Sequence, residues 1–323
     1  MKSALGIIAG LTIALVLVAV AFLGYGSFQA ANFLQASLRV GAPTAQGSGW
    51  PAPEGPTDIG FVGDPMSAFG YEFESVRLGS ELGDLPAWVV LPAQETGDVS
   101  RWAIFVHGIG GRRENGYRFV PVLRDAGYRV LLMSYRNDED APMSTEGLYA
   151  FGLTEWRDLE AAVEHALDSG AEKTVLVAES MGGAIAGQFL RRSPLAGSID
   201  AIVLDAPALD FPALVAAQID REGVPFAGLI ARGGFMVFNY RSGLDFAQAF
   251  TIPEFASFNG PLFLSHGARD RIVPVSGSDY LVEQRSGPTE YLRTDADHIL
   301  SWKADPEAFD GALAAFLAAL EPD

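Results

Sequence analysis

The sequence predicts an α/β fold in which a mostly parallel central sheet is covered by helices on both faces. From Trp102 onward, short apolar runs with strand character alternate with segments of helical periodicity. Such alternation is typical of parallel sheets, because the connection from one strand to the next crosses over through a helix. The runs themselves, such as Thr174–Ala178, are apolar and rich in β-branched residues, as expected for strands buried on both faces.

The composition limits the classes of function that remain open. The chain has 323 residues, of which 49% are hydrophobic and 19% are charged, enough for one large domain or two small ones. Its formal net charge of −18 argues against nucleic-acid binding, because little would neutralise the phosphates. The lack of cysteine excludes disulfides, thiolate catalysis and cysteine-based metal sites. The histidines, which are the candidates for a catalytic base, are His107, His165, His266 and His298.

The N-terminus predicts a membrane anchor. No charge lies between Lys2 and Arg39, and residues 4–24 are almost purely aliphatic and long enough to cross a bilayer as a helix. A cleaved signal peptide, followed by secretion, is the alternative, but the stretch around Ser27 offers no good cleavage site. Lys2 places the N-terminus in the cytoplasm and the rest of the chain outside it. Because this helix has no polar stripe, we expect it not to dock on the domain that follows.

These observations divide the chain into a short flank (1–3), a transmembrane signal anchor (4–24), a linker (25–65) and a large α/β domain (66–323). This domain opens with an expected hairpin of Tyr71–Leu78 and Leu85–Leu91 around a turn at 79–84. The further strands are expected at Trp102–Val106, Arg129–Ser134, Thr174–Ala178, Ala201–Leu204, Leu262–Ser265 and Thr289–Leu292. The helices are expected at Tyr117–Ala126, Thr154–Asp168, from Gly182 onward, and at Gly277–Arg285 and Pro306–Leu320.

One segment interrupts the alternation of strands and helices. Residues 210–258 are rich in aromatic side chains and show no clear strand pattern. We interpret about 207–258 as a small helical cap insertion. Its apolar residues suit an apolar ligand, although they would equally form the core of the cap itself.

The sequence around Ser180 predicts a nucleophile on a sharp turn. A buried strand ends at Ala178 and a helix begins at Gly182, which leaves Ser180 at the apex of a strand-to-helix turn. Small residues on both sides let the strand and the helix pass closely. The turn exposes the Ser180 hydroxyl and places the Met181 N–H at a helix N-terminus, which favours negative charge.

Two further residues complete a plausible reaction centre. Asp270 and His298 each follow the C-terminal end of an expected strand, and in an open α/β sheet that edge is where sites form. A serine hydroxyl needs a base such as His298, and a carboxylate at Asp270 would fix the tautomer of the imidazole. The developing oxyanion needs two N–H donors, which we assign to Met181 and to Ile109 in the glycine-rich loop after Trp102–Val106.

Over about residues 70–323 the chain resembles the α/β-hydrolase superfamily. The resemblance rests on A-E-S-M-G-G at 178–183, H-G-A-R-D-R-I-V-P at 266–274 and D-A-D-H at 295–298. It implies the α/β-hydrolase fold, and the chain looks like the exported or membrane-tethered esterase and acylaminoacyl-peptidase-like branch. The order of serine, acid and histidine in this superfamily favours Asp270 over Asp205, the rival acid that also follows a strand.

The remaining polar residues near these motifs have structural interpretations. His107 would support the glycine loop, His266 would pack in the core, and His165 would lie on the surface. Asp295 and Asp297 would shape the turn that aims His298. Glu179 would be structural, with a possible contact to a second histidine or an arginine of the site.

The sequence therefore predicts a serine hydrolase that cleaves an acyl ester through an acyl-enzyme on Ser180, without metal or organic cofactor. The expected partners are a small acyl substrate, apolar or lipid-like, and a membrane through the N-terminal helix, with no nucleic acid. The alternatives are an acylaminoacyl-type peptidase or a thioesterase with the same three residues, or a non-catalytic membrane-anchored scaffold.

Overall fold

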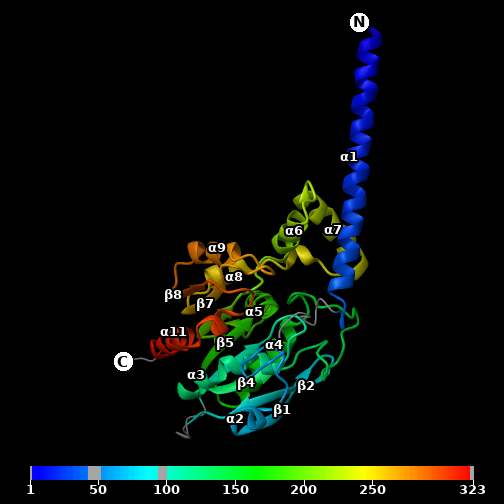
Figure 1. Ribbon diagram of the computed structural model, residues 1–323. Coiled ribbons are helices and arrows are strands. Elements are labelled where there is room, and N and C mark those ends of the chain that lie inside the picture. Colours follow the sequence, from blue (N-terminus) through cyan, green and yellow to red (C-terminus); the bar gives the residue numbers. More distant parts are fainter. Residues whose placement is uncertain (1, 43–51, 94–99, 321–323) are drawn as a thin grey trace.

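The computed structural model describes residues 2–42, 52–93 and 100–320 and contains an eight-stranded, mostly parallel sheet (Figure 1). The strand order is β1-β2-β4-β3-β5-β6-β7-β8, in which β2 pairs antiparallel with both β1 and β4 and the other neighbours are parallel. The strands are β1 Phe73–Ser80, β2 Gly83–Val90, β3 Arg101–Val106, β4 Arg129–Met133, β5 Lys173–Glu179, β6 Ala201–Asp205, β7 Leu262–Gly267 and β8 Thr289–Thr294. This architecture confirms the predicted fold class.

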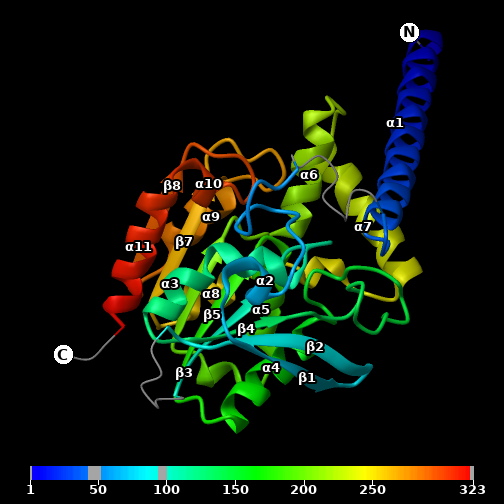
Figure 2. The same ribbon diagram turned by 60° about the horizontal axis from the view of Figure 1, so that its bottom comes forward.

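Helices cover both faces of this sheet (Figure 2). The α-helices are α1 Lys2–Ser37, α2 Pro65–Phe69, α3 Val120–Asp125, α4 Trp156–Asp168, α5 Met181–Arg192, α6 Phe211–Arg221, α7 Ala227–Ser242, α8 Ile252–Ser257, α9 Ser276–Gln284, α10 Ser301–Ala304 and α11 Pro306–Ala318. The 3₁₀-helices are η1 Arg113–Arg118, η2 Ala196–Ser198 and η3 Phe246–Gln248. The single helix expected at 117–126 is thus divided between η1 and α3, because Pro121 favours a helix start at this point.

Alternate side chains of the central strands enter two separate cores. In β3, Trp102 and Ile104 belong to the core beneath α4 and α5, whereas Ala103 and Phe105 belong to the core beneath α3 and α11. This alternation follows from the period of two residues in a strand. It explains why the central strands are continuous apolar runs, since neither face of the sheet meets water.

The cap is smaller than the sequence predicts. An antiparallel bridge between Asp210 and Phe250 closes the base of the insertion, and α6 and α7 protrude from the body above it. Helix α8 lies outside this protrusion and packs against α5 and α9, with Phe255 fully buried in the main core. The apolar face of α8 therefore belongs to the body, and only about residues 210–250 form the cap.

Helix α1 is longer than the predicted anchor and corrects the predicted linker. It continues without a break from Lys2 to Ser37, so residues 25–37 are helical, although we expected a linker from residue 25. Beyond α1, residues 38–42 join the body through a bridge between Arg39 and Leu148. The Pro- and Gly-rich segment 43–51 lies outside the described residues.

The C-terminal third of α1 docks on the protein, whereas residues 5–22, within the stretch expected not to dock, are exposed. Its contact is made by small residues rather than by a polar stripe. A Cβ at Gly26 would lie 2.9 Å from Cδ1 of Ile230 in α7, and one at Gly234 would lie 2.7 Å from Cβ of Ala30. Leu34 then reaches the main core, where it is buried. The two helices approach closely because glycine and alanine leave room for their backbones.

Candidate active site

Ser180 lies on a strained turn between β5 and α5. Its backbone angles are φ 51° and ψ −117°, a conformation that is unfavourable for a residue with a side chain. Glycines make the turn possible: a Cβ at Gly182 would collide with the Val106 carbonyl, and one at Gly183 would lie 2.6 Å from Cβ of Pro207. Strain of this kind persists only where the surrounding packing enforces it, and here it presents the Ser180 hydroxyl at the edge of the sheet.

His298 connects Ser180 to Asp270. Its Nδ1 lies 2.7 Å from Oδ2 of Asp270 and its Nε2 lies 2.9 Å from Oγ of Ser180. An ionised carboxylate only accepts, so Nδ1 carries the proton and donates it to Asp270. Nε2 is then free to accept from the Ser180 hydroxyl, which is the arrangement a general base requires.

The surroundings of Asp270 keep its carboxyl group ionised. Burial opposes the charge, but hydrogen bonds from His266, His298 and the Val273 N–H outweigh it and hold the pKa of Asp270 well below its usual range. Oδ1 also accepts the N–H groups of Ile272 and Val273, each at 2.8 Å.

His266 and Asp297 support this pair from opposite sides. Nε2 of His266 lies 3.1 Å from both the Val273 carbonyl and Oδ2 of Asp270, so this nitrogen donates. On the other side, Oδ1 of Asp297 accepts the N–H of His298 at 2.9 Å and so orients its turn. Asp295 lies further out and pairs with Arg269 at the surface.

The loop after β3 passes close to Ser180, because a Cβ at Gly108 would lie 2.9 Å from Cβ of Ser180. The carbonyl of Gly108 accepts from three donors: the Gly111 N–H at 3.0 Å, the Tyr135 hydroxyl at 2.9 Å and Nδ1 of His107 at 2.9 Å. In a trans peptide the N–H points opposite to the carbonyl, so these three bonds fix the direction of the Ile109 N–H. The N–H of Gly108 itself donates to Glu179 at 3.3 Å, whereas the N–H of Ile109 has no acceptor among the residues described.

His107 holds this loop and does not reach Ser180 in a basic role. Both of its ring nitrogens face acceptors, Nδ1 the Gly108 carbonyl and Nε2 the Asp138 carboxylate at 2.9 Å. Burial disfavours a charge on the ring, but Asp138 more than offsets this and raises the pKa of His107. Its ring also stacks on Tyr135, with 4.3 Å between centroids. His165, by contrast, is half-buried and meets the edge of Trp102, so it is less exposed than the sequence indicated.

A buried ionic cluster lies beneath the turn at Ser180. The Arg118 guanidinium contacts Oε2 of Glu179 at 2.5 Å and Oδ2 of Asp205 at 2.8 Å. Burial opposes ionisation of Glu179, but Arg118 outweighs it, and the pKa of Glu179 is lowered. Asp205 also accepts from Ser265 at 2.7 Å, so its carboxylate is occupied within the cluster. The structure thus places Asp205 in the cluster and Asp270 beside His298.

Arg118, Tyr135 and Asp138 belong to this region but were not predicted from the sequence. Tyr135 and Asp138 follow β4, whose carboxyl end meets the same sheet edge, and this position was a usable signal. Arg118 lies between the polar run 112–116 and the apolar run 119–123, and this position gives no signal of its two acidic partners.

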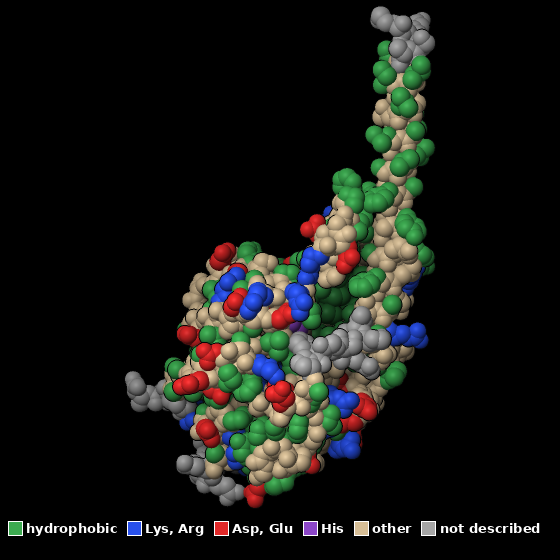
Figure 3. All heavy atoms as spheres, in the orientation of Figure 1, with side chains coloured by type: hydrophobic (Ala, Val, Ile, Leu, Met, Phe, Trp, Pro, Cys, Tyr) green, Lys and Arg blue, Asp and Glu red, His purple; other side chains and the backbone are tan. Residues whose placement is uncertain are grey.

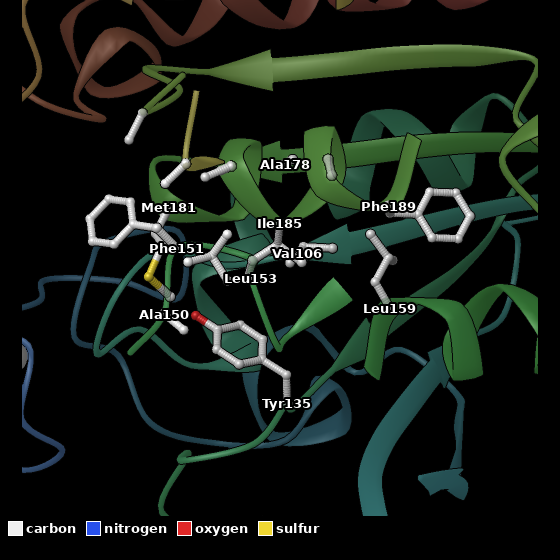
Figure 4. Packing of buried hydrophobic residues seen from close by; sticks show 14 of the residues in the cluster. Val106, Tyr135, Ala150, Phe151, Leu153, Leu159, Ala178, Met181, Ile185 and Phe189 are labelled. Atoms are coloured by element: carbon white, nitrogen blue, oxygen red, sulfur yellow. The ribbon is translucent and has the colours of Figure 1, made fainter. Parts of the chain in front are cut away.

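Apolar side chains line the helix side of the turn. Met181, Phe151 and Ile185 lie close together there (Figure 4). The ring of Phe151 stacks on Phe211 at the start of α6, with 3.8 Å between centroids. The base of the cap is therefore joined to the residue that follows Ser180 through aromatic packing.

Two cavities flank this region. One of about 830 Å³ adjoins the loop after β3 and is lined by charged residues such as Arg112 and Asp138. The other, of about 770 Å³, lies between α6 and α7 and has an apolar lining that includes Phe235 and Met236. Neither is lined by Ser180 or His298. Among the described residues no group of three His, Asp or Glu side chains is placed to hold a metal ion.

Comparison with known proteins identifies the family. Residues 103–322 match the alpha/beta hydrolase family (Abhydrolase_6), and the chain therefore belongs to it. The chain is 21% identical over 224 residues to the uncharacterized protein YqkD of Bacillus subtilis, which covers 68% of this chain and 72% of YqkD.

Solved structures show the same fold. The esterase Pf2001 of Pyrococcus furiosus is 22% identical, with a TM-score of 0.61 over 80% of this chain and 97% of that one. Est1E of Butyrivibrio proteoclasticus, solved with ferulic acid, is 15% identical, with a TM-score of 0.58 over 76% of this chain and 98% of that one.

Proposed function

We propose that this protein is a serine hydrolase that cleaves an acyl ester, with Ser180, His298 and Asp270 as its catalytic triad. The observation that carries the proposal is the unbroken chain of short contacts from Ser180 Oγ through the two nitrogens of His298 to Asp270. The membership of the family and the esterases among its structural neighbours make an ester the first substrate class to test.

In the acylation step, Oγ of Ser180 forms a bond to the ester carbonyl carbon while its proton passes to Nε2 of His298. The imidazolium that results is stabilised by the ionised Asp270. The carbonyl oxygen gains the negative charge and is bound by the N–H groups of Ile109 and Met181. The bond to the leaving oxygen then breaks, His298 returns the proton to it, and an alcohol leaves.

Deacylation repeats these steps with water. A water molecule gives its proton to His298 and its oxygen attacks the acyl carbon on Ser180. The second oxyanion binds the same two N–H groups. The bond between Ser180 Oγ and the acyl carbon then breaks, His298 returns its proton to Oγ, and a carboxylic acid leaves. The fixed Gly108–Ile109 peptide needs no rearrangement between the two halves, because His107 and Tyr135 hold it throughout.

We also propose that α1 anchors the protein in a membrane. Residues 5–37 form a helix long and apolar enough to cross one, and the side chains of Leu5–Phe22 are exposed. With the single N-terminal charge at Lys2, the catalytic domain lies on the extracytoplasmic side. Signal cleavage is the alternative, and recovery of a soluble chain without α1 would favour it.

Labelling with a fluorophosphonate tests the reaction. The wild-type chain should be labelled and should hydrolyse p-nitrophenyl esters, and Ser180→Ala should lose both by several orders of magnitude. Ser276→Ala, an exposed serine at the start of α9, is the matched control and should retain both. Labelling that survives in folded Ser180→Ala would refute the assignment. A panel of esters, thioesters and acylated amino-acid amides then separates the esterase from its alternatives.

A further inference from the structure

The cap and the anchor meet in a defined register. Helices α1 and α7 run in the same direction, because Ile230 faces Gly26, Gly234 faces Ala30, and Arg241 donates to the Asn32 side chain at 2.9 Å. The N-terminal end of α7 therefore points toward the N-terminal part of α1. Figures 1 and 2 agree that the turn between α6 and α7 is the part of the cap that rises highest beside α1.

This register places the tip of the cap at the surface of the bilayer. If α1 crosses a membrane, as proposed above, about 20 residues span the hydrocarbon core at 1.5 Å each, and residues 5–24 supply them. The exposed Tyr25 follows directly, and aromatic residues of this kind mark the boundary between membrane and water. Ile230 packs against Gly26, so the residues just before it in α7 lie at the level of this boundary.

The tip carries exposed apolar side chains at that level. Phe226 is 65% exposed and Leu229 is 55% exposed, and the exposed Pro225 precedes them. Phe226 adopts φ 60°, a left-handed conformation that is unfavourable for a bulky residue. The chain thus adopts a strained backbone at a residue whose side chain is mostly exposed.

We propose that the turn between α6 and α7, through Pro225, Phe226 and Leu229, inserts into the interface of the same bilayer that α1 crosses. The proposal rests on the proposed membrane anchor. A lipid surface fits better than a second protein, because the apolar patch is continuous with the exposed apolar surface of α1 (Figure 3). The charged residues just before the tip, Asp220, Arg221 and Glu222, carry no net positive charge, so insertion depends on apolar contact and does not require anionic lipid.

The docked tip would bring the cap and the body close to the membrane. Figure 3 shows a hollow lined by hydrophobic atoms between the cap, the lower end of α1 and the body, with histidine atoms at its edge. An ester dissolved in the outer leaflet would then reach this hollow without crossing bulk water. The proposal thus extends the proposed activity toward substrates that partition into membranes.

Site-specific probes in the full chain test the insertion. The protein has no cysteine, so Phe226→Cys and Tyr240→Cys each give one attachment site for an environment-sensitive fluorophore. Tyr240 is the matched control, since it is 91% exposed on the same helix but lies about 21 Å further from the tip. In phosphatidylcholine vesicles, the label at position 226 should shift to the blue and lose most of its intensity when doxyl-labelled lipid is added. The label at 240 should do neither.

Three results would overturn the proposal. An unshifted label at 226 in protein that floats with the vesicles would show that the tip stays in water. A blue shift without quenching by doxyl lipid would place the tip against protein instead, and equal quenching at 226 and 240 would refute contact through the tip alone. The readout needs no turnover, so it is separate from the failure of Ser180 chemistry. Protein that does not float with vesicles would refute the anchor itself.

A kinetic comparison gives the functional consequence. The double variant Phe226→Asp/Leu229→Asp should lose activity several-fold toward a long-chain ester held in phosphatidylcholine vesicles and keep its activity toward soluble p-nitrophenyl acetate. Aspartate tolerates positive φ better than phenylalanine, so the first substitution does not strain the backbone. Tyr240→Asp should leave both rates unchanged. Equal loss toward both esters would show damage to the cap and contradict the membrane role.

Discussion

Deleting the part of α1 that lies outside the proposed membrane span should destabilise the catalytic domain. The comparison is between a chain that starts at Tyr25, which keeps the docked part of the helix, and one that starts at Ala52. The second lacks Leu34 and Leu38, which are 2% and 4% exposed in the main core. Burial of a leucine contributes about 1.5–3 kcal/mol, so the two together account for about 3–6 kcal/mol.

The backbone adds to this loss. The Leu38 carbonyl accepts the Tyr149 N–H at 2.9 Å, and the Val40 N–H donates to the Gly147 carbonyl at 3.1 Å. Each such bond contributes about 0.5–1.5 kcal/mol net. Because small proteins are stable by only about 5–15 kcal/mol in all, the chain that starts at Ala52 should lie near or below the limit of folding at 37 °C.

Urea unfolding of the two chains measures the difference in their free energies of unfolding. A pair of point variants then distinguishes the loss of packing from the effect of shortening the chain. In the chain that starts at Tyr25, Leu34→Ala should cost about 2–5 kcal/mol. The adjacent Phe33 is 53% exposed, so Phe33→Ala should change stability by no more than about 0.5 kcal/mol. Equal unfolding midpoints for the two chains, or equal effects of the two variants, would refute the docking of this segment.

Further predictions concern the site. Asp270→Asn should lower kcat by up to about 10⁴-fold with little change in KM, because the amide no longer stabilises the imidazolium. Asp205→Asn should instead lower the urea concentration at the unfolding midpoint and have a much smaller effect on kcat than Asp270→Asn. Tyr135→Phe should lower kcat about tenfold and leave KM unchanged, since it frees the Gly108–Ile109 peptide, and an unchanged kcat would count against Ile109 as oxyanion donor. Glu179→Gln should cost about 3 kcal/mol at neutral pH by leaving Arg118 less well paired. The pKa of Glu179 is lowered in the folded state. The ionised carboxylate therefore contributes fully to the free energy of unfolding above about pH 4.5, and this contribution is lost as the pH falls further. The difference in free energy of unfolding in urea between wild type and Glu179→Gln should therefore become smaller in acid. A difference that does not depend on pH would contradict the ion pair between Glu179 and Arg118.

Much of the fold could be predicted because the buried strands have a recognisable sequence pattern. Continuous apolar runs, each followed by a small or polar residue, located the parallel strands and the edge at which Ser180, Asp270 and His298 meet. The topology of a parallel sheet brings the carboxyl ends of its strands together, so order along the chain carries information about proximity.

The rest depended on packing that a linear pattern does not encode. The contact between α1 and α7 is made by Gly26, Ala30 and Gly234, whose close approach is visible only when both helices are in place. Residues that act through another residue were equally hidden. Arg118 reaches Glu179 and Asp205 from a distant 3₁₀-helix, and nothing in its spacing to either acid indicates the contact.

The double attachment of α1 has a consequence for how substrate enters. Helix α1 contacts the cap through Gly26 and the body through Leu34, and the Arg39–Leu148 bridge just after the helix adds a second contact to the body. These contacts connect the cap to the body independently of the chain connections at the base of the cap. A swing of the cap away from the body would have to break these contacts. We therefore expect turnover to begin without a lag when the enzyme meets its substrate, because no movement of the cap away from the body precedes binding.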